Sequence, residues 1–181
     1  MPFSTSTFCN RGWRQYLSAA GLTLAGTLLL GACDQQRIAA IRPGETTESE
    51  IVAQWGTPEN VWMTPQGERV LEYNRQPNGE TNYMITIDTN GRVATFQNVL
   101  TRANFAQIQP GMHIDTVRKL LGRPAKVVPY ALSGETVHTW RWREGTGGAP
   151  YRLFEVTTDQ QNLVKRVADT EAPSSSESRN R

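Results

Sequence analysis

Apolar positions along this chain follow the same order of spacings twice. A short stretch with helical spacing ends at a glycine, and runs of alternating apolar and polar residues follow it. Helical spacing lines one stripe of a helix with core residues, and alternation does the same for one face of a strand. The pattern therefore predicts an α+β protein, with a helical segment followed by a small antiparallel sheet in each half.

Both predicted helices have a start and a stop signal. In the first half, residues 47–50 (TESE) have the sequence of a capping box, and Ile51, Val52 and Trp55 then share one face. Gly56 stands where a C-cap belongs. The second half repeats this order with Ile114, Val117, Leu120, Leu121 and Gly122.

A Pro-Gly pair precedes each helix. Proline presets φ and glycine accepts positive φ, so each pair suits the centre of a type II turn. The pairs are Pro43-Gly44 and Pro110-Gly111.

The alternating runs predict three strands in each half. Asn90-Gly91 between two such runs is a strong hairpin signal, and Asn162 is expected at positive φ in the matching turn. On the strand 137–143, alternation places His138, Trp140 and Trp142 on one face, with Val137, Thr139 and Arg141 on the other. The strands are expected over 70–75, 83–88, 92–96, 137–143, 153–158 and 163–167.

These matches indicate an internal duplication. Residues 41–44 recur as 108–111 at an offset of 67, and Tyr73 aligns with Trp140 at the same offset. Repeats at a fixed period indicate one structural unit built twice. The predicted organisation is a first repeat within 33–100, a second repeat over 101–167 that begins with a short helix or turn, and a polar, Ser-rich, disordered tail over 168–181.

Residues 1–32 have the three parts of an export signal. Arg11 and Arg14 precede an apolar stretch that ends at Leu30-Gly31-Ala32-Cys33. This ending resembles the lipobox of bacterial lipoproteins, which are cleaved between the residues here numbered Ala32 and Cys33. An ordinary secretory signal and a single membrane span remain alternatives, although a span needs about 20 apolar residues.

A lipidated Cys33 would anchor the chain to a membrane. Each buried CH₂ of an acyl chain such as palmitate contributes about 0.8 kcal/mol, so several chains hold almost permanently. The expected location is the periplasmic face of the outer membrane. Asp34, directly after the cysteine, resembles an inner-membrane retention signal, which leaves the inner membrane as the alternative.

Composition excludes several kinds of partner. The chain has 19 Lys and Arg and 17 Asp and Glu; without Arg11 and Arg14 it carries 17 of each sign. A neutral mature chain has no excess of basic charge for nucleic acid. Cys9 leaves with the signal and Cys33 is modified, so neither a disulfide nor a cysteine metal site is expected.

Both halves carry a motif set that resembles a known family. A Pro-Gly turn, a helix, Gly-x-Pro and a meander span 41–93 and 108–164, and the stretches IQPGMHIDTVRKLLGRPAKV and VHTWRWREG carry the likeness. The set resembles the SmpA/OmlA/BamE domain, and its tandem layout is similar to β-lactamase inhibitory proteins. This resemblance implies a lipid-anchored, non-enzymatic binding protein. The duplication departs from the single-copy lipoproteins that assist β-barrel assembly.

Residues that could perform chemistry lack supporting motifs. His113 and His138 have no metal-ligand spacing, and structural roles are expected for both. Ser133 could be combined with Asp88 and Glu68, but no nucleophile elbow is present. The glycine-rich stretch 145–148 lacks the Lys-Ser/Thr of a phosphate loop and is expected to be a hairpin loop. No enzyme activity, cofactor, metal or small-molecule substrate is therefore expected.

Exposed aromatic and arginine side chains are the predicted contact surface, because these residue types carry much interface energy. The alternative is that the tryptophans complete the core. The predicted function is an anchored adaptor that binds an envelope protein, for example a component of the β-barrel assembly machinery. The alternative is an inhibitor of an enzyme such as a lysozyme or β-lactamase. The candidates are Trp142, Arg141, Arg143, Trp62 and Tyr130.

Overall fold

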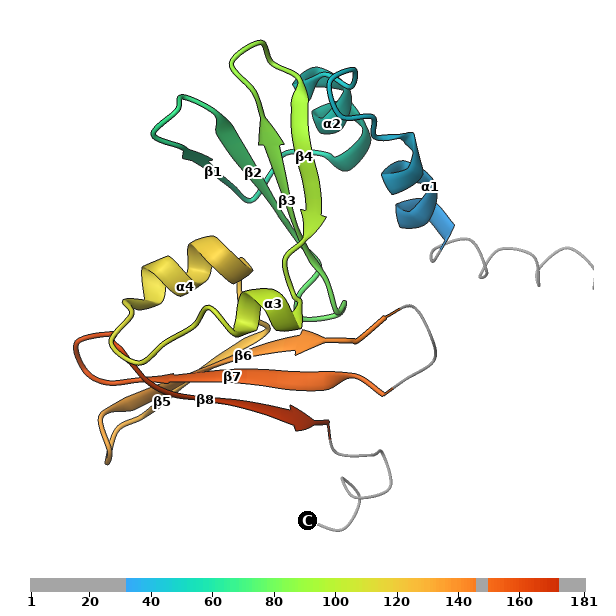
Figure 1. The fold of residues 1–181 in the computed structure, drawn as a ribbon. Helices are drawn as coiled ribbons and strands as arrows, with labels where there is room; N and C mark the ends of the chain where they lie inside the picture. The colour runs from blue at the N-terminus through green and yellow to red at the C-terminus, as the bar shows by residue number, and fades with distance from the viewer. Residues whose placement is uncertain (1–31, 146–149, 173–181) are drawn as a thin grey trace, which may run out of the picture. The chain divides into compact units, whose positions relative to one another are not determined.

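The computed structural model describes residues 32–145 and 150–172 (Figure 1). The chain divides into one unit over 1–40 and a second over 41–181. The described part of the first unit is helix α1, Ala32–Ala40, whose second residue is Cys33. Among the described residues, no helix is long and apolar enough to cross a membrane. The predicted export signal lies outside the described residues.

The second unit contains two α+β repeats, which confirms the predicted fold class. In the described part of each repeat, a helix accompanies a four-stranded antiparallel sheet, in the order β1-β2-β3-β4 and β5-β6-β7-β8. The first repeat consists of α2 Glu48–Trp55, β1 Asn60–Met63, β2 Arg69–Asn74, β3 Asn82–Ile87 and β4 Val93–Asn98. The remaining elements are α3 Arg102–Phe105, α4 Ile114–Leu121, β5 Lys126–Tyr130, β6 Glu135–Trp142, β7 Arg152–Thr158 and β8 Val164–Glu171.

The predicted start and stop signals of α2 are confirmed. The Thr47 side chain accepts from the Glu50 backbone, and the Glu50 side chain accepts in return from the Thr47 backbone. Gly56 caps the helix at φ 82°. Ile51 is fully buried, whereas Val52 is 37% exposed, so the prediction that Val52 shares the buried face is wrong.

The predicted turns are also present. Gly44 and Gly111 have φ of 79° and 87°, as a type II turn requires after Pro43 and Pro110. Asn162 has φ 61°, as expected for its turn. The short helix expected within 101–107 is α3.

Each sheet has one strand more than the predicted meander. The additional strands, β1 and β5, lie at sheet edges and pair with β2 and β6. Their side chains are mostly exposed, and β5 contains Pro129, so neither shows the regular alternation that marks a half-buried strand.

The predicted start of a disordered tail at Ala168 is wrong, because β8 continues to Glu171. Asp169 accepts hydrogen bonds from Trp142 Nε1 at 3.1 Å and from Arg152 Nε at 2.9 Å. These partners, far away in sequence, hold a polar segment in the sheet. Residues 173–181 lie outside the described residues, as do 146–149 of the expected glycine-rich loop.

The duplication extends to individual hydrogen bonds. Tyr73 Oη donates to the carbonyl of Gly56 at 2.8 Å, and Trp140 Nε1 donates to the carbonyl of Gly122 at 3.0 Å. In both repeats an aromatic side chain of the second strand therefore binds the glycine that ends the helix.

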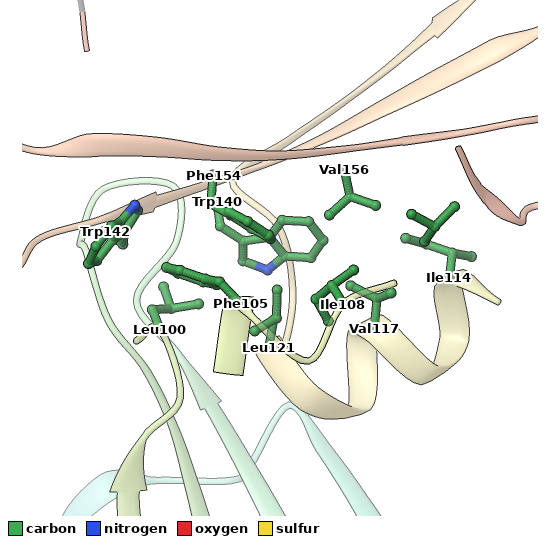
Figure 2. Packing of buried hydrophobic residues seen from close by; sticks show 11 residues of the cluster. Leu100, Phe105, Ile108, Ile114, Val117, Leu121, Trp140, Trp142, Phe154 and Val156 are labelled. Atoms are coloured by element: carbon green, nitrogen blue, oxygen red, sulfur yellow. The ribbon is translucent and has the colours of Figure 1, made fainter. Parts of the chain in front are cut away.

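Each repeat has its own aromatic core. In the first, the Trp55 ring packs against Tyr73, Tyr83 and Phe96. In the second, Phe105 stacks on Phe154 with ring centres 4.1 Å apart. Figure 2 shows this second cluster, formed by Leu100, Phe105, Ile108, Ile114, Val117, Leu121, Trp140, Trp142, Phe154, Val156 and Val164.

The end of α4 makes polar contacts with the first sheet. Asn82 is fully buried, and its Nδ2 donates to the carbonyls of Leu121 and Arg123 at 2.8 and 2.9 Å. The backbone N–H of Arg123 donates to Glu72 Oε1 at 2.8 Å. The two bonds from Asn82 satisfy carbonyls at and just beyond the end of the helix, which lack partners within the helix.

Candidate protein-binding surface

The structure separates the five predicted contact residues into four groups. Trp142 is in the second core, Arg143 joins the two repeats, and Trp62 is half-buried on edge strand β1. Arg141 and Tyr130 lie in the second sheet and line the same hollow. The hollow is therefore where two of the candidates meet.

Trp142 is 1% exposed, so the prediction that it belongs to an exposed contact surface is wrong. Its ring centre lies 4.9 Å from that of Phe105, and its Nε1 donates to Asp169. The guanidinium of Arg102 covers the ring at 5.3 Å. In the first repeat, the guanidinium of Arg75, which is at the position equivalent to Trp142 at the offset of 67, likewise covers an indole ring, that of Trp55, at 5.1 Å.

Arg143 takes part in the packing of the two repeats. Its Nε and Nη2 donate to the two carboxylate oxygens of Glu80 at 2.6 and 3.0 Å. This bidentate hydrogen bond holds the pKa of Glu80 below its usual value, against the opposing effect of burial. The guanidinium of Arg143 is thereby engaged within the protein.

The hollow lies on one face of the C-terminal sheet and has a volume of about 390 Å³. Sheet register explains its composition, since Val128 and Val137 are direct cross-strand partners and Arg141 pairs with Leu153. The prediction that Val137, Thr139 and Arg141 share a face is confirmed. The lining residues are Pro77, Ala125, Lys126, Val128, Tyr130, Val137, Thr139, Arg141, Leu153 and Glu155.

The apolar lining residues belong to a different face from the core. Trp140 and Phe154, which are cross-strand partners, point into the core, and successive side chains alternate between faces. Val137 and Leu153 therefore lie on the outer face and remain partly exposed. They leave apolar area that the protein itself does not cover.

Arg141 forms one end of the hollow. Its guanidinium lies 4.2 Å from the Tyr151 ring centre, and Nη1 donates to the carbonyl of Pro77 at 3.3 Å. Nη2 lies 4.0 Å from Glu80. The buried Nε finds no acceptor among the described residues. The planar group is thus held in place, with a third of the side chain still exposed.

Tyr130 forms the opposite end of the hollow, where the β5–β6 hairpin turns. It is 53% exposed, and its carbonyl accepts from Gly134 N at 2.9 Å to close the turn. Leu132, at the tip, is fully exposed at 107%. We call these two exposed side chains the hairpin tip.

Sequence reasoning missed Val128 and Leu153 as lining residues of the hollow, and it missed Leu132 as an exposed apolar side chain. Alternation along a strand shows which residues of that strand share a face. The register between strands is also needed to show that residues of β5 and β7 lie beside Val137 of β6. Leu132 gave no periodic signal because it lies in a turn.

The histidines occupy structural positions in the second repeat. His113 caps α4, where its Nδ1 accepts from the Asp115 backbone at 3.3 Å. His138 is 8% exposed, and burial lowers its pKa, with a further contribution from the positive charge of Arg118. Among the described residues, no three His, Cys, Asp or Glu side chains form a group able to hold a metal ion. The Ser133 hydroxyl donates to the carbonyl of Tyr130.

Comparison with known proteins gives two solved structures of similar layout. One is a DUF4309 family protein, YjgB, from Bacillus subtilis, with 13% identity, a TM-score of 0.29 and coverage of 74% of this chain and 83% of that one. The other is a proposed β-lactamase inhibitor protein from Streptococcus mutans, with 9% identity, a TM-score of 0.32 and coverage of 77% and 96%. Both likenesses concern the path of the chain and carry no functional conclusion.

No protein-family model matches this chain. No curated protein matches it either. The resemblance to the SmpA/OmlA/BamE domain therefore stays a prediction from the sequence motifs.

Proposed function

We propose that this protein is a membrane-tethered, non-enzymatic adaptor that binds an envelope protein through the outer face of its C-terminal sheet. The observation that carries the proposal is the hollow, whose apolar side chains Val128, Val137 and Leu153 pack in neither core. Apolar area gathered in a hollow with a few polar groups is typical of a binding site. The β-barrel assembly machinery is one partner that fits an adaptor on the outer membrane.

The tether is the second part of the proposal, and Cys33 would carry it. The residue lies in α1, directly before the unit that starts at Ile41. Acyl chains at this position would keep the binding face within reach of membrane proteins. Mass spectrometry of the native protein should find acyl groups on an N-terminal Cys33. A bare polypeptide in the soluble fraction would contradict the tether.

Binding through the hollow is tested by crosslinking in native membranes, followed by purification of the lipidated protein. Leu153→Glu places a charge in the hollow and should reduce the captured partner at least tenfold. Met63→Glu is the matched control, because Met63 is 66% exposed on the first sheet and should leave capture unchanged. Equal capture by both variants would contradict the proposed site.

The same experiment separates an adaptor from an inhibitor. A captured enzyme whose activity falls on addition of the soluble Cys33→Ser form would replace the adaptor with an inhibitor. An adaptor predicts that the captured partner keeps its activity.

A further inference from the structure

At the Arg141 end of the hollow, two guanidinium groups share one carboxylate. Both oxygens of Glu80 already accept from Arg143, at 2.6 and 3.0 Å. Arg141 Nη2 lies 4.0 Å from the same carboxylate. One carboxylate neutralises one of the two positive charges, so this end of the hollow keeps a positive charge in excess.

The opposite end has the same arrangement. Glu135 is the cross-strand partner of Tyr130, which lines the hollow there. Its carboxylate lies 3.0 Å from Arg166 Nη2 and 2.6 Å from Lys165 Nζ. Hydrogen bonds from these two cations lower the pKa of Glu135 to about 2, so the carboxylate is charged but neutralises only one of them. One positive charge is again in excess.

Between the two ends, the charges of the lining cancel without pairing. Lys126 and Glu155 are the cross-strand partners of Thr139 on its two sides. Neighbouring strands lie about 4.8 Å apart, which separates the backbones of Lys126 and Glu155 by about 10 Å. Thr139 Oγ1 donates to Glu155 at 3.3 Å, whereas Lys126 is exposed and forms no ion pair within the described part of the chain. The hollow is therefore apolar in part, with a surplus of positive charge at both ends.

Resting on the proposed function that this face binds protein, we propose that the bound segment of the partner carries acidic side chains beside apolar ones. The apolar side chains would cover Val128, Val137 and Leu153, and the carboxylates would meet the surplus positive charge. Partner surfaces pair potentials of opposite sign, which favours encounter with the right partner and disfavours a basic one. A segment without charge would cover the cations and supply no counter-charge.

Arg141 is prepared for a carboxylate. Its guanidinium lies 4.2 Å from the ring centre of Tyr151, and Nη1 donates to the Pro77 carbonyl at 3.3 Å. These contacts fix the plane of a side chain that is still a third exposed. A guanidinium held in one orientation binds a carboxylate with less loss of side-chain freedom. We therefore expect one acidic side chain of the partner at this end.

An anionic bilayer fits this face less well than an acidic protein segment. Basic patches that bind anionic lipid consist of about four to eight Lys and Arg side chains. Here Arg143 is bound to Glu80, and Lys165 and Arg166 are bound to Glu135. The apolar lining also lies in a hollow, which a side chain enters more readily than a flat surface.

The test compares two neutralising substitutions within the hollow, made in the full chain in its native membranes. An aromatic photo-crosslinking amino acid replaces Tyr130 of the hairpin tip, and the yield of its adduct with protein is measured. Lys126→Gln should lower this yield about threefold and Glu155→Gln should raise it about threefold, as expected for exposed charge pairs. An increase of NaCl from about 0.05 to about 0.5 M should lower the yield with the parent sequence, because salt screens such pairs.

Two controls carry the same change of charge outside the hollow. Lys119→Gln alters an exposed lysine on α4, and Glu45→Gln alters a side chain of the first repeat that is 72% exposed. Neither should change the yield. Tryptophan fluorescence confirms that each variant is folded, because Trp140 and Trp142 are almost fully buried.

The signs of the two effects decide the outcome. Effects of the opposite sign would indicate a basic segment, and a yield that neither substitution nor salt changes would indicate an uncharged one. Either result overturns the acidic partner and leaves the adaptor in place. Adducts with lipid alone, adducts with a second copy of this chain, or no adduct would overturn both proposals.

The partner side provides the final check. Mass spectrometry of the adduct identifies the partner segment, whose Asp or Glu residues are then replaced by Asn or Gln. If these carboxylates bind the hollow, their loss should abolish the difference in yield between the parent and Lys126→Gln. A difference that persists would contradict the proposal.

Discussion

Gly56 and Gly122 end their helices with nearly the same backbone, at φ 82° and 74°, but in different surroundings. A Cβ on Gly56 would meet nothing within 4 Å. A Cβ on Gly122 would lie 2.6 Å from Asn74 Oδ1 and 3.0 Å from Glu72 Oε1. At Gly56, glycine is needed only for the positive φ. At Gly122, it is needed both for the positive φ and because neighbouring side chains leave no room for a Cβ.

Gly56→Ala should cost about 1–2 kcal/mol of unfolding free energy, because L-residues are strained at positive φ. Gly122→Ala should cost clearly more, since the methyl group also displaces the side chains that join the repeats. Urea denaturation followed by tryptophan fluorescence measures both. Equal losses would show that the contacts around Gly122 adapt freely.

The hydrogen bond from Tyr73 to Gly56 gives a second test at this scale. Tyr73→Phe removes the hydroxyl that donates at 2.8 Å and should cost about 0.5–1.5 kcal/mol. Tyr130→Phe is the control. The Tyr130 side chain is half exposed, so removal of its hydroxyl should leave the free energy of unfolding nearly unchanged. Urea denaturation of both variants provides the comparison.

Among the elements, the sequence predicted the helices and turns that are specified by residues within the element itself. The capping box at Thr47 and the glycine turns each act within a few residues, and all are present. Edge strands β1 and β5 pair with the next strand in local hairpins, but their mostly exposed side chains show no regular alternation. The end of β8 is held by partners distant in sequence. From sequence alone, the polar segment 168–171 is predicted to be a disordered tail, because its partners in the sheet are not evident.

The end of β8 depends on Asp169, which accepts from Trp142 and Arg152. Asp169→Ala leaves the buried indole N–H without its acceptor and should cost about 1–3 kcal/mol. It should also raise amide hydrogen exchange at residues 168–171. Glu171→Ala is the control, since this side chain is 72% exposed and its contact with Arg152 is 3.6 Å long. Similar protection in both variants would mean that backbone pairing alone holds the strand.

For the whole molecule, a second set of contacts that join the repeats comes from the loop between β2 and β3. The buried Gln76 amide donates to the Arg141 carbonyl at 2.7 Å and accepts from its N–H at 3.3 Å. The candidate site depends on this packing, because Pro77 of the same loop lines the hollow beside Arg141. Residue type suggested Arg141 and Tyr130 as contact residues, but no spacing in the sequence relates them to a loop of the other repeat.

Glu80 makes this packing sensitive to pH, because hydrogen bonds from Arg143 lower its pKa in the folded protein. A carboxyl whose pKa is lower in the folded state stabilises the fold above its ordinary pKa of about 4.3 and loses that effect as pH falls through its folded value. Glu80→Gln should therefore be less stable than the parent at pH 7, by about 0.5–1 kcal/mol after solvent screening.

The gap between the parent and Glu80→Gln should begin to narrow as pH falls below the ordinary carboxyl pKa of about 4.3, and it should close once pH is below the lowered pKa of Glu80 in the folded protein. Urea denaturation at a series of pH values measures it. Glu45→Gln supplies the control, because its partner Arg42 lies 3.7 Å away and both side chains are more than 70% exposed, so little gap is expected at any pH. A gap for Glu80→Gln that stays constant with pH would show that shape, and not the charge of Glu80, holds the repeats together at this contact.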